Sequence, residues 1–133
     1  MNSFVALVAV VCMCGQAYGG WTEVWRDDFN GNSLDQNNWK LETGTGQNGW
    51  GNGEMEYYTN GQNLQVQNGV LTITARVEDV ENSHFTSSRL NSKNAWAYGK
   101  FEARARLPKG KNLWPAIWLF PQSNTYGGWY AVI

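Results

Sequence analysis

The stretch GVLTITARVE, residues 69–78, decides the fold class because its apolar side chains recur at every second position. One face of an extended chain would carry Leu71, Ile73, Ala75 and Val77, while Thr72, Thr74 and Arg76 would occupy the other. A period of two is typical of a strand with one buried face. The stretch therefore predicts a half-buried antiparallel strand.

Two later stretches extend this pattern. In YGKFEARARLP, residues 98–108, apolar and charged side chains alternate. One face would carry Phe101, Ala103, Ala105 and Leu107, and the opposite face would carry Lys100, Glu102, Arg104 and Arg106. LWPAIWLFP, residues 113–121, is apolar almost throughout and predicts a strand buried on both faces. Pro115 must start that strand or lie at a bulge because it lacks an N–H.

Glycine and asparagine clusters such as NGNS, NGQN, QNG and PKGKN separate these runs, and they predict turns. No segment of useful length repeats its apolar residues every 3.6 positions. Short alternating runs between such turns indicate an all-β sandwich or barrel.

The first 19 residues carry no charged side chain, and an apolar run from Phe4 to Cys14 precedes small residues. This pattern predicts a secretory signal peptide over residues 1–19, with a buried N-terminal helix or strand as the alternative. Both cysteines, Cys12 and Cys14, lie inside it. We therefore expect an extracellular, secreted domain without disulfides, starting at residue 20.

Composition narrows the function. The net charge of −1 offers no basic field for nucleic acid, and the apolar run is about half of the ~20 residues that a membrane span needs. His84 is the one histidine, and we expect its polar stretch to be a surface loop. A Cys/His metal cluster is therefore excluded, and a hydroxyl or thiol nucleophile paired with histidine is disfavoured. The 8 Trp, together with many amide side chains, suit a carbohydrate ligand, although tryptophan also fills cores.

The most distinctive stretch is GWGNGEMEYY, residues 49–58, where alternate glycines predict tight turns that leave Trp50 and Asn52 projecting. Glu54 and Glu56 lie two positions apart, so an extended chain points them to the same face. Such a pair is either an acid with a base or, more commonly, two carboxylates that bind backbone donors or an arginine.

Arg89 occupies an expected strand position between Phe85 and Leu90. Its guanidinium could donate several hydrogen bonds to sugar hydroxyls. The sequence leaves that role and an ordinary solvated charge equally open.

Five stretches of the sequence, in this order, resemble glycoside hydrolase family 16. They are WRDDFNGNSLDQNNWKLETG, GWGNGEMEYYT, NLQVQNGVLTITA, FTSSRLNSK and YGKFEARARLPKGKNLWPAIWLFP. Within that family they are most similar to the laminarinase-like endo-β-1,3-glucanases and to their non-catalytic relatives, the β-1,3-glucan-binding proteins. The resemblance covers about residues 21–129 and corresponds to the N-terminal half of the family domain.

The resemblance implies a concanavalin A-like β-jelly-roll sandwich, here truncated, with β-1,3-glucan lying across its concave sheet. The residues that it implies as sugar contacts are Trp50, Asn52, Arg89, Trp114 and Trp129. Glu54 and Tyr57 would support the cleft. No cofactor is required, although some members bind a structural calcium, for which Asp27 and Gly69 are weak candidates. The partner is a polysaccharide, and we expect a monomer without nucleic-acid or membrane partners.

Family chemistry is retaining hydrolysis by two glutamates about 5–5.5 Å apart, from a Glu-(Ile/Leu)-Asp-x-x-Glu motif that follows GGWP. Here the corresponding text is GGWYAVI, residues 127–133. We therefore expect the catalytic glutamates beyond Ile133, no catalytic residue within this chain, and no activity from the chain as given. Three hypotheses stay open: part of a glucanase, a non-catalytic glucan-binding pattern-recognition protein, and, least favoured, an unrelated β-sandwich lectin.

Overall fold

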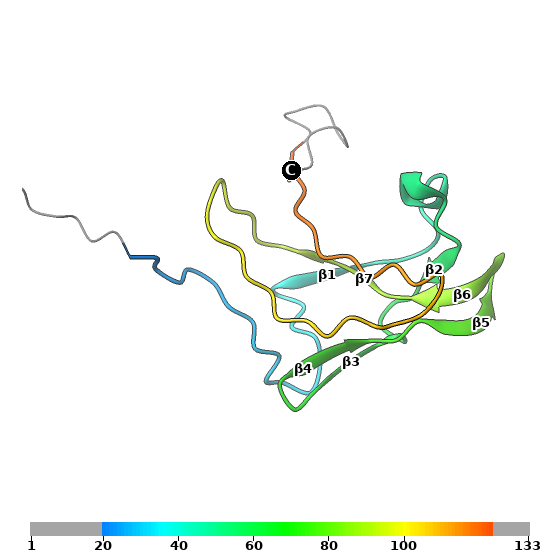
Figure 1. The fold of residues 1–133 in the computed structure, drawn as a ribbon, viewed down its shortest axis with the longest axis horizontal. Helices are drawn as coiled ribbons and strands as arrows, with labels where there is room; N and C mark the ends of the chain where they lie inside the picture. The colour runs from blue at the N-terminus through cyan, green and yellow to red at the C-terminus, as the bar shows by residue number, and fades with distance from the viewer. Residues whose placement is uncertain (1–19, 124–133) are drawn as a thin grey trace, which may run out of the picture.

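The structure, a computed structural model, describes residues 20–123, and its regular elements are seven short strands and one helical turn, joined by long irregular segments (Figure 1). The elements are β1 (Trp39–Glu42), η1 (Gly49–Gly53), β2 (Glu56–Tyr58), β3 (Leu64–Gln67), β4 (Val70–Ile73), β5 (Arg76–Val80), β6 (Ser83–Ser87) and β7 (Arg89–Ser92). The one helical element in this range, η1, is a single π-type turn. No helix between residues 20 and 123 has the length and apolarity to cross a bilayer. The predicted all-β class is confirmed.

β3 and β4 form a tight antiparallel hairpin. Gln67 pairs with Val70, which leaves Asn68 and Gly69 as a two-residue loop. Both loop residues have positive φ, 53° and 73°. That conformation is typical of a type I′ turn, for which Asn-Gly is the preferred pair. The turn predicted at QNG is therefore confirmed.

The strand predicted over residues 69–78 is divided in two. β4 pairs with β3, whereas β5 pairs with β6, so the chain changes partners between them. The expected buried face is also wrong, since Ile73 is 45% and Val77 is 85% exposed. Within residues 20–123 no second layer covers these side chains, and alternation alone does not supply one.

The remaining strands bring distant parts of the chain together. β1 pairs antiparallel with β7, and β6 lies between β2, parallel to it, and β5. A bridge between Gly44 and Tyr58 joins the two groups, and only Ser88 separates β6 from β7. Arg89 begins β7 directly opposite Glu42, the last residue of β1. The functional side chains described below gather at this junction.

The buried centre of the described residues is mainly polar. Its apolar members are Tyr58 and Val66, and its polar members are Thr59, Asn63, Ser83, Thr86 and Ser88. Asn63 is the hub: its side chain binds the hydroxyls of Thr59 and Thr86 and the backbone oxygen of Thr74. A hydrogen-bonded network of this kind fixes one arrangement of the surrounding strands.

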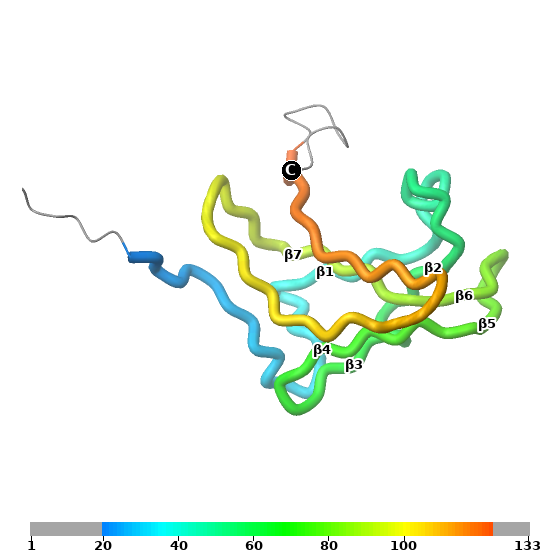
Figure 2. Tube along the Cα trace, viewed as in Figure 1, coloured from blue at the N-terminus to red at the C-terminus, as the bar shows by residue number. Residues whose placement is uncertain are grey.

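The strands predicted at residues 98–108 and 113–121 are not formed. Figure 2 follows this yellow-to-orange segment out and back around a turn at residues 110–112, where PKGKN predicted one. Its apolar side chains are exposed; Leu107, for example, is 58% and Ile117 is 67% accessible. A strand needs a hydrogen-bonding neighbour, and none of the described residues pairs with this segment.

Candidate functional site

One group of charged and aromatic side chains surrounds the guanidinium of Arg89. We call it the Arg89 cluster, and its members are Glu42, Trp50, Glu54, Glu56, Tyr58, Arg89 and Trp118. They come from β1, η1, β2, β7 and the extended segment that follows β7. With three carboxylates and one cation, the cluster carries a formal charge of −2.

Arg89 lies between two glutamates. Its Nε donates to Oε2 of Glu42 at 2.7 Å, and its Nη1 lies 3.8 Å from Oε1 of Glu54. The three side chains are only 13–18% exposed, so solvent screens the charges less than it does on an open surface. The remaining guanidinium N–H groups are free of these two contacts and could donate to a ligand.

Aromatic rings lie on the same guanidinium. Its carbon is 4.5 Å from the ring centre of Trp50 and 5.2 Å from that of Trp118. Tyr58 is more distant, at 6.0 Å. A cation over an indole is attracted by the negative face of the ring, which favours these separations. Arg89 therefore joins two rings as well as two carboxylates.

The hydroxyl of Tyr58 meets both glutamates of the GEMEYY stretch. It lies 2.7 Å from Oε2 of Glu54 and 2.9 Å from Oε1 of Glu56 and can donate to one of them at a time. Burial is the first cause that raises the pKa of Tyr58 well above its ordinary value, and its hydrogen bond to Glu54 is the second. The prediction that the two glutamates share a face is confirmed, and their contacts favour the structural role over an acid–base pair.

Trp50 is held in an unusual backbone conformation. Its φ of 54° lies in the left-handed region, which non-glycine residues rarely occupy. Gly46, at φ 59°, lies so close that an added Cβ would be 2.5 Å from the indole Cδ2. The predicted tight turn is present, but the ring folds onto Tyr58, with ring centres 5.9 Å apart, and does not project into solvent.

The structure brings four predicted site residues together: Trp50, Asn52, Glu54 and Arg89. Asn52 is exposed, and its amide donates to Oε1 of Glu54 at 3.1 Å. The cluster residues that sequence reasoning missed are Glu42, Tyr58 and Trp118. Because charge pairing across strands has no local signal, Glu42, 47 positions from Arg89, could not be found from spacing.

Two predicted residues lie elsewhere. Tyr57 points to the opposite face of β2 from Tyr58, where the carboxylate of Glu81 raises its pKa, so it lies outside the Arg89 cluster and its role as a cleft support stays a prediction. Trp114 is 78% exposed and contacts no other ring between residues 20 and 123. The indole over Arg89 belongs to Trp118 instead. The structure does not describe Trp129 or the predicted signal peptide at residues 1–19.

The weak calcium candidates, Asp27 and Gly69, would act through backbone oxygens, so the side-chain contacts below do not test them. Both carboxylate oxygens of Asp27 accept hydrogen bonds, from Phe29 N at 2.8 Å and from Trp39 Nε1 at 2.7 Å. Gly69 instead lies near the backbone oxygen of Asp28 and Oδ1 of Asn30. Calcium takes six to eight oxygens, and residues 20–123 contain no group of three or more His, Cys, Asp and Glu suited to a metal. A structural calcium stays a prediction.

His84 was predicted in a loop, and this is wrong because it lies within β6. The side chain is nevertheless on the surface, where its Nδ1 meets the carboxylate of Asp79, and both side chains are 81% exposed. The His84–Asp79 pair is therefore an exposed surface contact and does not belong to the Arg89 cluster.

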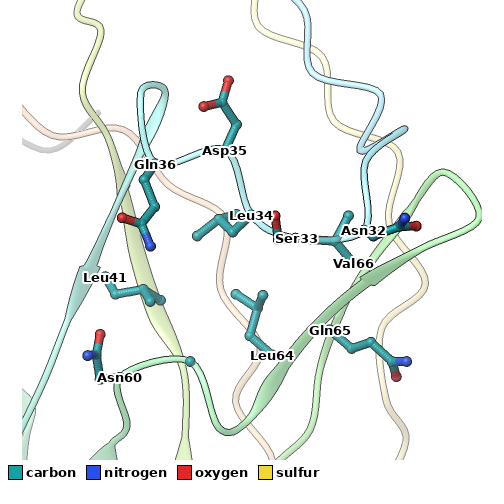
Figure 3. Close-up of a pocket in the computed structure, with 11 residues that line it drawn as sticks. Asn32, Ser33, Leu34, Asp35, Gln36, Leu41, Asn60, Leu64, Gln65 and Val66 are labelled. Carbon is teal, nitrogen blue, oxygen red and sulfur yellow. The ribbon is translucent and has the colours of Figure 1, made fainter.

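A groove of about 730 Å³ lies on the other face of β1 from Glu42. Figure 3 shows Leu34, Leu41 and Leu64 pointing into it, with amide side chains such as Asn60 at its rim. A second groove of about 730 Å³ shares Leu41 and is lined mainly by polar residues. Neither of these two grooves is lined by an indole.

Tyr58→Phe should make unfolding less dependent on alkaline pH. The folded state raises the pKa of Tyr58, so the unfolded chain ionises first; the stability that this supplies is complete below about pH 10 and is lost as pH rises further. The variant should lose about 1–2 kcal/mol at pH 7, since Glu54 and Glu56 lose their shared donor, and should show a shallower decline above pH ~10. Urea unfolding between pH 7 and 11 measures both effects. Tyr98→Phe, at a 90% exposed position, is the control; an unchanged slope in Tyr58→Phe would contradict the assignment.

Comparison of the chain with known proteins shows which family it belongs to. The sequence profile of glycosyl hydrolases family 16 matches residues 50–128, a range that begins at Trp50 and includes Arg89. The chain is 46% identical to a glucan endo-1,3-beta-glucosidase of Cryptopygus antarcticus, over 97% of this chain and 49% of that protein. It is 48% identical to a beta-1,3-glucan-binding protein of Penaeus monodon, over 35% of this chain and 13% of that protein.

A solved structure gives the same result. The laminarinase of Rhodothermus marinus superposes with a TM-score of 0.76 at 45% identity, covering 84% of this chain and 46% of that chain. The expected β-jelly-roll fold is thereby confirmed. The chain spans about half the length of the Cryptopygus and Rhodothermus proteins. On its sequence match, its strands and this superposition, the chain belongs to glycosyl hydrolases family 16.

Proposed function

We propose that the protein is a secreted glycosidase that binds laminarin-type β-1,3-glucan at the Arg89 cluster and, with the family's catalytic glutamates, hydrolyses internal β-1,3 bonds with retention. The observation that carries the proposal is the joining of indoles, carboxylates and a guanidinium at one site. Rings suit the C–H faces of sugars, and the charged groups suit their hydroxyls. The names of the Cryptopygus and Rhodothermus relatives support β-1,3-glucan as the polymer.

The printed chain contains no Glu-(Ile/Leu)-Asp-x-x-Glu sequence. We therefore propose that the catalytic pair lies in sequence that follows Ile133 and that these 133 residues alone hydrolyse nothing. A non-catalytic glucan-binding role is the alternative, and the similarity to the Penaeus protein favours keeping it.

Calorimetric titration of the full-length protein with laminarin, mixed-linkage glucan and cellulose oligosaccharides tests the binding proposal. We expect laminarin to bind and Trp50→Ala to weaken that binding about tenfold, equivalent to ~1.4 kcal/mol. Trp21→Ala, at a 77% exposed tryptophan outside the cluster, should leave binding unchanged. Failure of laminarin to bind, or equal loss in both variants, would refute the proposal.

Reducing-sugar release from laminarin then separates enzyme from binder. A glucanase releases sugar, with retention seen by NMR of the first-formed anomer. Binding without release identifies the alternative function.

A further inference from the structure

We propose that Glu42 is a positioning residue for glucan binding, acting through Arg89 to fix the indole of Trp50. This inference rests on the proposed function, and it adds a residue that lies outside the family match at residues 50–128.

The position of Trp50 is unfavourable by itself. The residue has a left-handed backbone, and its indole Nε1 is buried without a hydrogen-bond partner among the described residues. A buried unpaired N–H and a left-handed non-glycine residue both disfavour this arrangement. Other contacts must therefore stabilise it.

Residues from three separate segments of the chain contact the indole. The guanidinium of Arg89 lies 4.5 Å from its ring centre, and the ring of Tyr58 lies 5.9 Å away. Gly46 leaves no space on its side, since an added Cβ would come within 2.5–2.8 Å of Cδ2, Cε2 and Cγ. Of these contacts, the guanidinium is the one on a long, rotatable side chain.

Glu42 removes that freedom. Glu42 and Arg89 are cross-strand partners in the β1–β7 pair, and the Nε–Oε2 distance is 2.7 Å. Hydrogen bonding at Nε orients the guanidinium plane, whereas the contact with Glu54 is longer, at 3.8 Å. Arg89 is the one side chain that Glu42 contacts by hydrogen bond or ion pair among residues 20–123. Among the described residues, Glu42 is therefore connected to Trp50 through Arg89.

The chain supplies a matched control. Arg26 and Glu23 form an ion pair with the same 2.7 Å separation, but their side chains are 59% and 56% exposed, and the cation–π contacts within residues 20–123 involve Arg89 and not Arg26. Glu23→Gln thus removes an equivalent charge where no indole depends on it.

The test is a double-mutant cycle on the full-length protein, with Kd for a laminari-oligosaccharide from calorimetry. Glu42→Gln should raise Kd about tenfold, and Glu23→Gln by less than about twofold. In a Trp50→Ala background, Glu42→Gln should add less than about twofold, since the ring that it positions is gone. Near-ultraviolet circular dichroism of the free protein should change in its indole bands for Glu42→Gln and not for Glu23→Gln.

Additive losses of about a hundredfold in the double variant would overturn the inference, as would an unchanged Kd for Glu42→Gln. If Glu42→Gln fails to fold, Glu42→Asp, which keeps the charge on a shorter side chain, should raise Kd about threefold and follow the same non-additivity. A wild-type protein that binds no laminarin refutes the proposed function itself, whereas normal wild-type binding with an unaffected Glu42→Gln refutes only the role of Glu42.

Discussion

Arg89→Ala should weaken glucan binding at least ~30-fold and destabilise the fold by about 2–4 kcal/mol. The substitution leaves the carboxylates of Glu42 and Glu54 without their cation while both side chains are less than one-fifth exposed. Removing one partner of a buried ion pair costs about 3–5 kcal/mol, and the partial exposure here reduces that figure. Trp50 and Trp118 also lose the guanidinium between them.

Urea unfolding measures the stability change, and titration with laminari-oligosaccharides measures binding, which should weaken at least ~30-fold. Arg76→Ala is the matched control because the Arg76–Glu78 contact is 3.8 Å long and both side chains are more than 40% exposed. An exposed pair of that kind contributes about 0–1 kcal/mol. Equal losses for the two arginines would show that Arg89 is an ordinary surface charge.

Local sequence signals predicted what depends on neighbouring residues. The Asn68–Gly69 turn followed from the need for positive φ at both loop positions. The shared face of Glu54 and Glu56 followed from strand alternation, and both reach one hydroxyl. Trp50 and Arg89 came from the resemblance, and the structure brings them into contact.

What the sequence did not predict depends on pairing between distant segments. Tyr57 and Tyr58 are adjacent, and strand alternation places their rings on opposite faces of β2. Which of the two rings joins the site depends on where Glu54 lies relative to β2, and the structure shows that it is Tyr58. Trp114 and Trp118 lie four positions apart, so strand alternation would place both on one face. Their segment forms no strand, and of the two it is Trp118 that lies over Arg89. Glu42 carries no local mark, and its role follows from the β1–β7 register.

The exposed segment at residues 98–121 shows the other limit. Alternation predicted strands there, but a strand forms only where a neighbour offers backbone donors and acceptors. Within residues 20–123 those partners are absent, and large side chains such as Trp114 and Ile117 stay accessible. A period of two therefore indicates that a segment can form a strand, whereas the presence of a pairing neighbour decides whether the strand forms.

Asn63→Ala should be the most destabilising single change outside the Arg89 cluster, lowering the free energy of unfolding by about 2–4 kcal/mol. Asn63 is 1% exposed; its Nδ2 donates to Thr74 O and Thr86 Oγ1, both at 2.8 Å, and its Oδ1 accepts from Thr59 Oγ1 at 2.6 Å. Alanine removes these bonds and leaves buried groups unpaired, at about 1–3 kcal/mol each before relaxation.

Asn63 makes two bonds at the point where the chain passes from β4 to β5: its side-chain Nδ2 donates to Thr74 O, and its backbone O accepts from Thr74 N, both at 2.8 Å. Loss of the side-chain bond should loosen the backbone bond beside it. Asn63→Ala should therefore increase amide hydrogen exchange at Thr74 and Thr86 as well as lower the urea midpoint. Asn60→Ala, at an exposed position three residues earlier, should change stability by less than about 0.5 kcal/mol. A loss below ~1 kcal/mol for Asn63→Ala, with unchanged exchange at Thr74, would mean that the strands hold this junction without the amide.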